Sequence, residues 1–354
     1  MKKINVILAG IAVMSLAVSC NGFLGDLGIM APGVDMKINH ESEVSSQKLA
    51  NLDGISYVKV ASQGDLFVEK VATEPAKATC TTTTGTVNLT GGRVAIDGAD
   101  LPGATKPLEG AILSSAIIVT VENPTPEPVD FETTVVIDGK PGTVSGMGVA
   151  DNSVKDFGLC VGDVNEIQER TNYEDPVLLS DELAEPLTDG VNEIELKDMG
   201  VTFKKGSKVA PAAGGTYQFT VKAKYYASLS YVPGTKLQFV KTFNDLGVQI
   251  DIDKVFKEYD IYFSVESTIP FDIKFSATSP DGLVGTSDDV IKAGAPGAPV
   301  KSSVVMHVVD NSGNKVNAIS SATITLDLTA VEGAKFSQGQ SLKIDTSKLT
   351  IVKL

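Results

Sequence analysis

The sequence contains no tryptophan, only two histidines and only two arginines, Arg93 and Arg170, among its 354 residues. Lysine therefore carries almost all the basic charge, and the formal net charge is −14. A chain this acidic lacks the basic surface that nucleic-acid phosphates require, so we do not expect a nucleic-acid partner. The same charge disfavours an anionic membrane surface, and any membrane attachment is expected to come through lipid.

Sequence signatures of catalysis and of structural zinc are also missing. There is no Gly-x-Ser-x-Gly motif and no CxxC pair, and the glycine-rich stretch 139–148 lacks the Gly-Lys-Ser/Thr ending of a phosphate-binding loop. His307 lies in an alternating apolar segment, where a histidine is more often packed or at a sheet edge than catalytic. We therefore expect a non-enzymatic protein without a cofactor.

The first residues have the pattern of an export signal. Lys2 and Lys3 precede an almost entirely apolar run, residues 4–18, which is too short to span about 30 Å of hydrocarbon comfortably. The run ends on Ala17-Val18-Ser19-Cys20, which resembles the lipobox of bacterial lipoproteins, with alanine where leucine is usual. The resemblance implies a signal peptide over 1–19 and a lipid on Cys20. An ordinary secreted protein cut near Ser19 is the alternative.

Two cysteines remain after Cys20. In an oxidising compartment Cys80 and Cys160 either form a disulfide or stay as two separate buried thiols, and the sequence leaves both readings open. A bridge over so long a loop would contribute about 4–5 kcal/mol in the chain-entropy model. Residues 20–51 are polar and glycine-containing, and we interpret them as the lipidated cysteine and a flexible tether.

The rest of the chain has the pattern of an all-β protein. Short runs of β-branched and aromatic residues alternate with polar ones and are bounded by Gly, Asn, Asp and Pro. Helical patterns are rare: 180–187 has a capping serine and predicts a turn or two, whereas the acidic stretch 165–175 is interpreted as a solvated loop. Many short strands at this spacing predict immunoglobulin- or fibronectin-like β-sandwiches.

One proline-containing segment, predicted to form a corner between two strands, occurs twice in the sequence. VENPTPEPVDF (121–131) and VESTIPFDIKF (265–275) align without gaps, and an Asp-Gly turn follows each copy. Proline cannot sit in a central ladder, so each copy ends one strand and sets the direction of the next. We therefore expect two tandem sandwich domains, 52–205 and 206–354, produced by an internal duplication. The alternative is that proline corners simply recur in a long β protein.

Two resemblances go with this pattern. The first corner and its flanks resemble the strand–Asn-Pro–strand–Asp-Gly pattern of water-stress/late-embryogenesis-abundant type-2 domains, which are fibronectin-like sandwiches; no function is carried over. The whole chain is similar to the tandem β-sandwich lipoproteins common in Bacteroidota, through its signal, its Lys-rich acidic composition and its strand-corner style. That similarity implies anchoring at the outer membrane, with the surface-facing and periplasm-facing orientations both open.

Candidate ligand sites are few. SPDGLVGTSDD offers Asp281, Asp288 and Asp289 as hard oxygen ligands for Ca²⁺, although their spacing does not match an EF-hand loop and a solvated acidic turn is the alternative. Tyr225, Tyr226 and Tyr231 are the best candidates for stacking against a sugar, with an ordinary strand pair as the alternative.

These features favour a non-catalytic, lipid-anchored cell-envelope protein with a structural, adhesive or assembly role, whose partner is another envelope protein. The alternative is a carbohydrate-binding accessory lipoprotein of the outer membrane, whose partner is a glycan.

Overall fold

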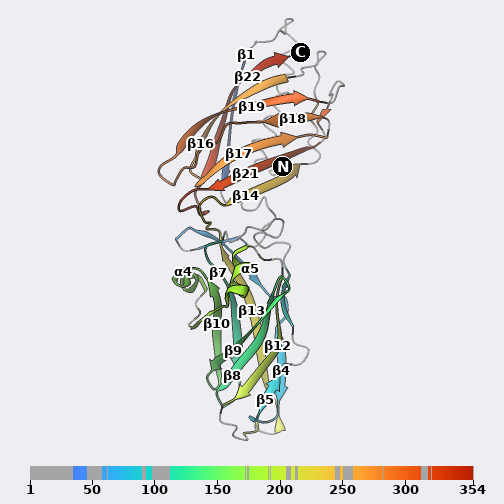
Figure 1. Ribbon diagram of the computed structural model, residues 1–354, viewed down its shortest axis with the longest axis vertical. Coiled ribbons are helices and arrows are strands. Elements are labelled where there is room, and N and C mark those ends of the chain that lie inside the picture. The colour runs from blue at the N-terminus through green and yellow to red at the C-terminus, as the bar shows by residue number, and fades with distance from the viewer. Residues whose placement is uncertain are drawn as a thin grey trace. The chain divides into compact units, whose positions relative to one another are not determined.

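The computed structural model describes most of the chain downstream of residue 34 (Figure 1). The described residues are 35–45, 58–61, 63–89, 93–97, 112–171, 173, 175–189, 191, 193–204, 209–211, 214–243, 248–249, 258–280, 282–311, 318–319 and 321–353. Of the described residues 63% are in strands and 7% in helices, which confirms the all-β sandwich prediction. The chain divides into two compact units. The inserted unit is Ile55–Val232, and the discontinuous unit joins Met1–Gly54 to Pro233–Leu354.

The inserted unit contains two sheets. The first has the order β11-β10-β7-β13-β3-β2, and β4 also pairs with β13. The second has the order β5-β12-β8-β9, and β6 also pairs with β12. The strands are β2 (Val58–Val60), β3 (Leu66–Val71), β4 (Ala76–Cys80), β5 (Thr86–Asn88), β6 (Val94–Asp97), β7 (Ser115–Asn123), β8 (Val129–Ile137), β9 (Lys140–Val149), β10 (Ser153–Val161), β11 (Asp175–Leu178), β12 (Glu193–Phe203) and β13 (Tyr217–Ser228).

The discontinuous unit is built on eight strands in the order β1-β22-β16-β19-β18-β17-β21-β14. Phe263 and Phe275 meet edge-on, with ring centroids 5.9 Å apart, so β16 and β17 face each other across the core. The strands are β1 (Asp35–Ser45), β14 (Lys236–Phe243), β16 (Glu258–Ser267), β17 (Phe271–Thr278), β18 (Leu283–Thr286), β19 (Val300–Asp310), β21 (Ala322–Ala330) and β22 (Ser341–Lys353). β15 (Val248–Gln249) and β20 (Ala318–Ile319) form a separate short pair.

The two units share one strand topology. In the inserted unit β7 pairs with β10 and β13, and β8 pairs with β9 and β12. In the discontinuous unit β16 pairs with β19 and β22, and β17 pairs with β18 and β21. Six strands therefore match in chain order and in these four pairings: β7, β8, β9, β10, β12 and β13 correspond to β16, β17, β18, β19, β21 and β22. The units differ at one point, because β18 also pairs with β19 and joins the discontinuous unit into one sheet, whereas β9 and β10 belong to separate sheets. The shared topology supports the duplication hypothesis well beyond the repeated corner.

The repeated corner has the same local geometry in both units. The Asn123 side-chain oxygen accepts the backbone N–H of Thr125 at 3.0 Å, which is an Asx turn. At the aligned position, Ser267 Oγ accepts the backbone N–H of Ile269 at 3.1 Å, which is the serine equivalent. The Asn-to-Ser difference therefore preserves the turn, because either side chain supplies an acceptor two residues before the N–H that it caps.

The expected boundary near residue 206 is wrong. β13 lies beyond that point, yet it pairs with β7, β3 and β4 and forms the middle of the first sheet. Without β13, β7 and β3 would each lose a hydrogen-bonding partner. The division falls instead between Val232 and Pro233.

The tether prediction is wrong for residues 35–45. They form β1, which pairs antiparallel with β22 from Asp35–Thr350 to Ser45–Ser341, with one irregularity between Lys37 and His40. A strand at the end of a sheet has one solvated edge, so polar residues are tolerated there. The remaining tether residues, like the signal peptide and Cys20, lie outside the described part of the chain.

The described part of the inserted unit also contains two helices. α5 (Asp181–Asp189) fulfils the short-helix prediction, and its Leu183 packs so closely over Gly142 that a β-carbon there would overlap the leucine side chain. α4 (Val164–Thr171) corrects the expected acidic loop at 165–175. Asp163 caps α4 by accepting the backbone N–H groups of Asn165 and Glu166 at 2.9 and 3.2 Å. Neither helix is long and apolar enough to cross a membrane, and the described residues contain no other that is.

Candidate functional site

The three tyrosines proposed to stack against a sugar are buried. Tyr225 and Tyr226 have no exposed surface and Tyr231 is 3% exposed. Successive residues of a strand point to opposite faces, so Tyr225 and Tyr226 belong to different layers of packing. The prediction of a tyrosine platform is therefore wrong. Burial also raises the pKa of Tyr225 well above its ordinary value.

Tyr226 belongs to an apolar cluster between the first sheet and α4. The cluster packs strand residues against residues from α4 and the segment after it: Phe67, Ala116, Ile118, Cys160, Ile167, Tyr173 and Tyr226. The Tyr173 ring packs directly against the backbone of Gly158, and only a glycine permits this contact, because a β-carbon on Gly158 would lie 2.5 Å from Tyr173 Cε2. α4 thus covers the region in which a tyrosine-lined groove would have been open to solvent.

Both cysteines of the proposed disulfide are free thiols. Cys80 pairs with Tyr217 at the start of β13, whereas Cys160 pairs with Ala116, which in turn pairs with Tyr226 near the end of that strand. Nine residues of β-strand span about 30 Å, which a disulfide cannot bridge. Cys160 donates its S–H to the Tyr173 hydroxyl, with 2.9 Å between Sγ and Oη, and burial raises the pKa of the thiol.

Only two of the three aspartates proposed to bind Ca²⁺, Asp288 and Asp289, lie within the described residues. Asp281 lies outside the described residues. Asp289 Oδ2 accepts the backbone N–H of Val305 at 2.8 Å, and its own N–H donates to Ser287 Oγ at 3.2 Å. The described residues contain no group of three or more His, Cys, Asp or Glu side chains arranged to hold a metal ion. The described residues therefore give no support for a calcium site at Asp288 and Asp289.

His307 lies on a strand, as expected, and is half-buried. Its Nδ1 lies 2.7 Å from Asp260 Oδ1 on the neighbouring strand β16. The two residues are directly opposite each other in the β16–β19 ladder, so the contact joins two central strands. The contact joins the side chains of two neighbouring strands, and the arrangement supports a structural role.

Several ion pairs lie on one face of the first sheet of the inserted unit. Glu69 interacts with Lys59 and Lys224, and Lys222 Nζ lies 2.5 Å from Glu122 Oε1. These pairs link neighbouring strands across the outer face of the first sheet. The lysines and glutamates of this face pair with one another, so the face does not present an unpaired cluster of one charge to a ligand.

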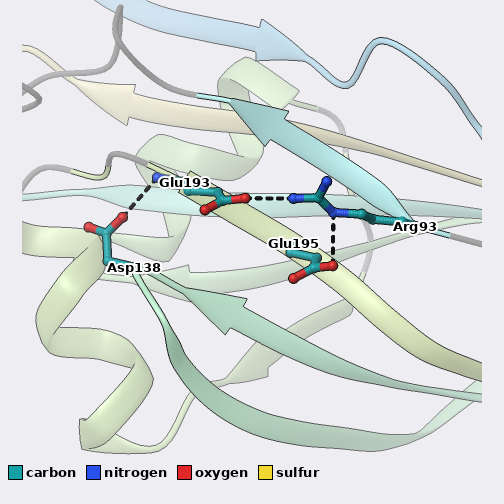
Figure 2. A network of polar contacts seen from close by, with 4 residues as sticks. All are labelled: Arg93, Asp138, Glu193 and Glu195. Atoms are coloured by element: carbon teal, nitrogen blue, oxygen red, sulfur yellow. Dashed lines mark hydrogen bonds and ion pairs between the residues drawn. The ribbon is translucent and has the colours of Figure 1, made fainter.

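Figure 2 shows a polar network on the second sheet, around one of the two arginines. Arg93 donates to Glu193 Oε1 at 2.6 Å and to Glu195 Oε1 at 2.8 Å, so it ties the segment at β6 to β12. Asp138 Oδ1 accepts the backbone N–H of Glu193 at 2.8 Å and connects the β8–β9 turn to the same place. Arg93 and Glu193 are about half-exposed, so each pair contributes at most about 1 kcal/mol. Both carboxylates face the guanidinium, which therefore supports the sheet rather than an anion.

The sheet edges differ between the units. Edge strands of the inserted unit are short or carry proline: β2 and β5 have three residues each, β6 has four, β4 has five, β11 contains Pro176, and β9 contains Pro141 and several glycines. Proline, glycine and short length all discourage a further strand from pairing. These features protect the inserted unit against edge-to-edge association.

The discontinuous unit ends on longer edges. β1 has eleven residues and β14 has eight, and neither contains proline or glycine. β1 pairs with β22 and β14 pairs with β21, and within the described part of the chain neither has a second neighbour. Val240 on β14 is 48% exposed. The sequence does not predict either edge, because pairing partners far apart in the chain leave no local signal and the residues of β1 have the polar composition of a tether.

Comparisons with known proteins add no family. No family model matches the sequence, and no curated protein matches it. A solved structure from Parabacteroides distasonis, described as a candidate secreted protein, is 13% identical, with a TM-score of 0.49 over 90% of this chain and 99% of that one.

Two further likenesses are weaker. The VP2 subviral particle of infectious bursal disease virus is 10% identical, with a TM-score of 0.23 over 81% of this chain and 42% of that chain. The CBM22-1-CBM22-2 tandem domain of Paenibacillus barcinonensis Xyn10C is 9% identical, with a TM-score of 0.18 over 92% and 100%. All three TM-scores are below 0.5, so none of these likenesses indicates a function for this chain.

Proposed function

We propose that the chain is a non-catalytic, lipid-anchored protein of the cell envelope that serves assembly or adhesion through the sheet edges of its discontinuous unit. The observation that carries the proposal is the contrast between the two units. The inserted unit has short or proline-containing edges, whereas β1 and β14 are long and free of proline. An edge of that kind can accept a further strand through main-chain hydrogen bonds.

Attachment to the outer membrane is the second part of the proposal. It is supported by the basic start, the apolar run and the small residues before Cys20. Lipid on Cys20 would hold the protein at a membrane that its net charge of −14 does not attract.

The carbohydrate-binding alternative now has less support. Its candidate platform was Tyr225, Tyr226 and Tyr231, and all three are buried. A sugar-binding role would need aromatic surface elsewhere, in a chain without tryptophan.

The proposal is tested in intact cells that carry either the natural chain or Cys20→Ser. We expect the natural chain in the membrane fraction and the variant released, and we expect chemical cross-linking to join the natural chain to a protein partner. A variant that remains membrane-bound would remove the lipid anchor from the proposal. A natural chain that forms no cross-linked species would remove the assembly role.

Protease treatment of the same cells decides which side the protein faces. Cleavage while a periplasmic control survives would place it outside, where adhesion is feasible. Protection until the outer membrane is breached would place it inside and confine the role to assembly with envelope partners.

A further inference from the structure

We propose that the partner at these edges is a second copy of this chain, with β1 of one molecule pairing with β14 of the other. The inference rests on the proposed assembly role and names its partner. It follows from the positions of the two strands in the sheet, from their charges and from the protected edges of the inserted unit.

The backbone arrangement supplies the two halves of such an interface. β1 and β14 are the two ends of the eight-strand order. Each is paired along its length on one side: β14 matches β21 residue for residue from Lys236–Thr329 to Phe243–Ala322. The opposite side of each strand offers N–H and C=O groups for which the described part of the chain supplies no strand partner. Joining β1 to β14 would continue the sheet from one molecule into the next.

Charge selects which edges can meet. β1 carries three carboxylates, Asp35, Glu41 and Glu43, and one lysine, Lys37. β14 carries two lysines, Lys236 and Lys241, and no carboxylate. Like charges directly opposite each other destabilise a strand pair and opposite charges stabilise it. Pairing β1 with β1 or β14 with β14 is therefore disfavoured, whereas β1 with β14 is favoured.

A second copy is the partner that this arrangement identifies, because each molecule presents both the acidic edge and the basic edge. The two patches are different surfaces, so the contact is heterologous. Repeating it gives either a closed ring or dimer or an open filament, according to the rotation between copies. Lateral association of this kind is compatible with molecules held at one membrane.

The test measures self-association of the full lipidated chain in detergent by sedimentation velocity. We expect species larger than the monomer at about 0.1 M salt, and weaker association at about 1 M salt, where the screening length falls to about 3 Å. Lys236→Glu with Lys241→Glu should weaken association on the order of tenfold, and so should Glu41→Lys with Glu43→Lys. Mixing the two double variants should restore a mixed species, because their edges are again complementary.

The matched control reverses two lysines on inner strands of the same sheet, Lys274→Glu on β17 and Lys301→Glu on β19, because neither strand pairs with β1 or β14. Far-UV circular dichroism and thermal unfolding check that every variant is folded. Because a β1 variant that loses its fold cannot report on the edge, the β14 variant and the salt dependence decide the question without it.

Three outcomes would overturn the inference: a natural chain that is monomeric at all concentrations, association that the β14 variant leaves unchanged, or a control that weakens association equally. A monomeric chain that still cross-links to another envelope protein in cells would refute self-pairing alone. The proposed assembly role would then stand with a different partner.

Discussion

The contact between Gly158 and Tyr173 permits a quantitative test of the cluster beneath α4. Gly158 lies on β10, and an added β-carbon would lie 2.5–2.7 Å from three carbon atoms of the Tyr173 ring. The glycine is not in the left-handed region, so Gly158→Ala causes no backbone strain. Overpacking costs about 1–3 kcal/mol, and replacing a strand glycine by alanine returns about 0.5–1 kcal/mol. We expect a net loss of about 1–2 kcal/mol.

The assay is urea unfolding of the full chain followed by far-UV circular dichroism. Two units can give two unfolding transitions. We expect Gly158→Ala to lower the midpoint of the transition that reports on the inserted unit. With a slope of about 3 kcal/mol/M, a loss of 1.5 kcal/mol lowers the midpoint by about 0.5 M. Gly148→Ala is the matched control, since its nearest neighbour would be Lys204 Nζ, the movable end of a side chain, at 3.3 Å. That variant should be neutral or slightly stabilising.

A double-mutant cycle shows whether the tyrosine ring is the cause. Tyr173→Ala alone should cost about 3 kcal/mol, because it uncovers the cluster. In that background Gly158→Ala should become neutral or stabilising, since the ring that opposed the new methyl group is gone. An equal cost in both backgrounds would refute the reasoning and point to the strand itself.

Three further predictions concern the corner, the outer face and the thiols. Asn123→Ala should destabilise the inserted unit by about 2–4 kcal/mol in urea unfolding, because it leaves buried polar groups of the corner without hydrogen-bond partners. Asn123→Ser should retain part of that stability, because the serine at the equivalent position, Ser267, accepts the same backbone hydrogen bond in the second corner. Burial raises the pKa of Glu69, but its hydrogen bond to Lys59 and the charge of Lys224 outweigh this and lower it overall. Its stabilisation is therefore present above the unfolded-state pKa and is lost on acidification, so the deficit of Glu69→Gln measured at neutral pH should shrink below about pH 4. Cys80 and Cys160 should both be alkylated in the unreduced, denatured chain, as mass spectrometry would show; a fraction that requires reduction first would contradict the strand register.

The parts of the fold that follow from local pattern were predictable from the sequence. The alternation of apolar and polar residues and the turn-forming residues predict the strands and the Asp138-Gly139 turn. Both turn residues have positive φ, which fits a two-residue hairpin. The Ser180 region gave α5. Each of these depends on residues that are neighbours in the chain.

Features that depend on distant partners were not predictable in this way. Nothing local in β1 indicates β22, and nothing near residue 206 indicates that β13 belongs with β7. Tyr226 reads as an exposed strand residue until α4 is placed over it, and α4 itself is polar enough to resemble a loop. The candidate site failed for the same reason, because burial is decided by elements far away in sequence.

The pairing of β1 with β22 also fixes the order in which the molecule can be completed. β22 pairs with both β1 and β16, and it is the last described strand of the chain. The inserted unit can form all its described ladders before β22 has emerged, but β1 must wait for β22. Such non-local closure is slow and leaves strand edges exposed in the meantime. A protein delivered across a membrane from its N-terminus would thus hold one unit finished and the other open until its final strand arrives.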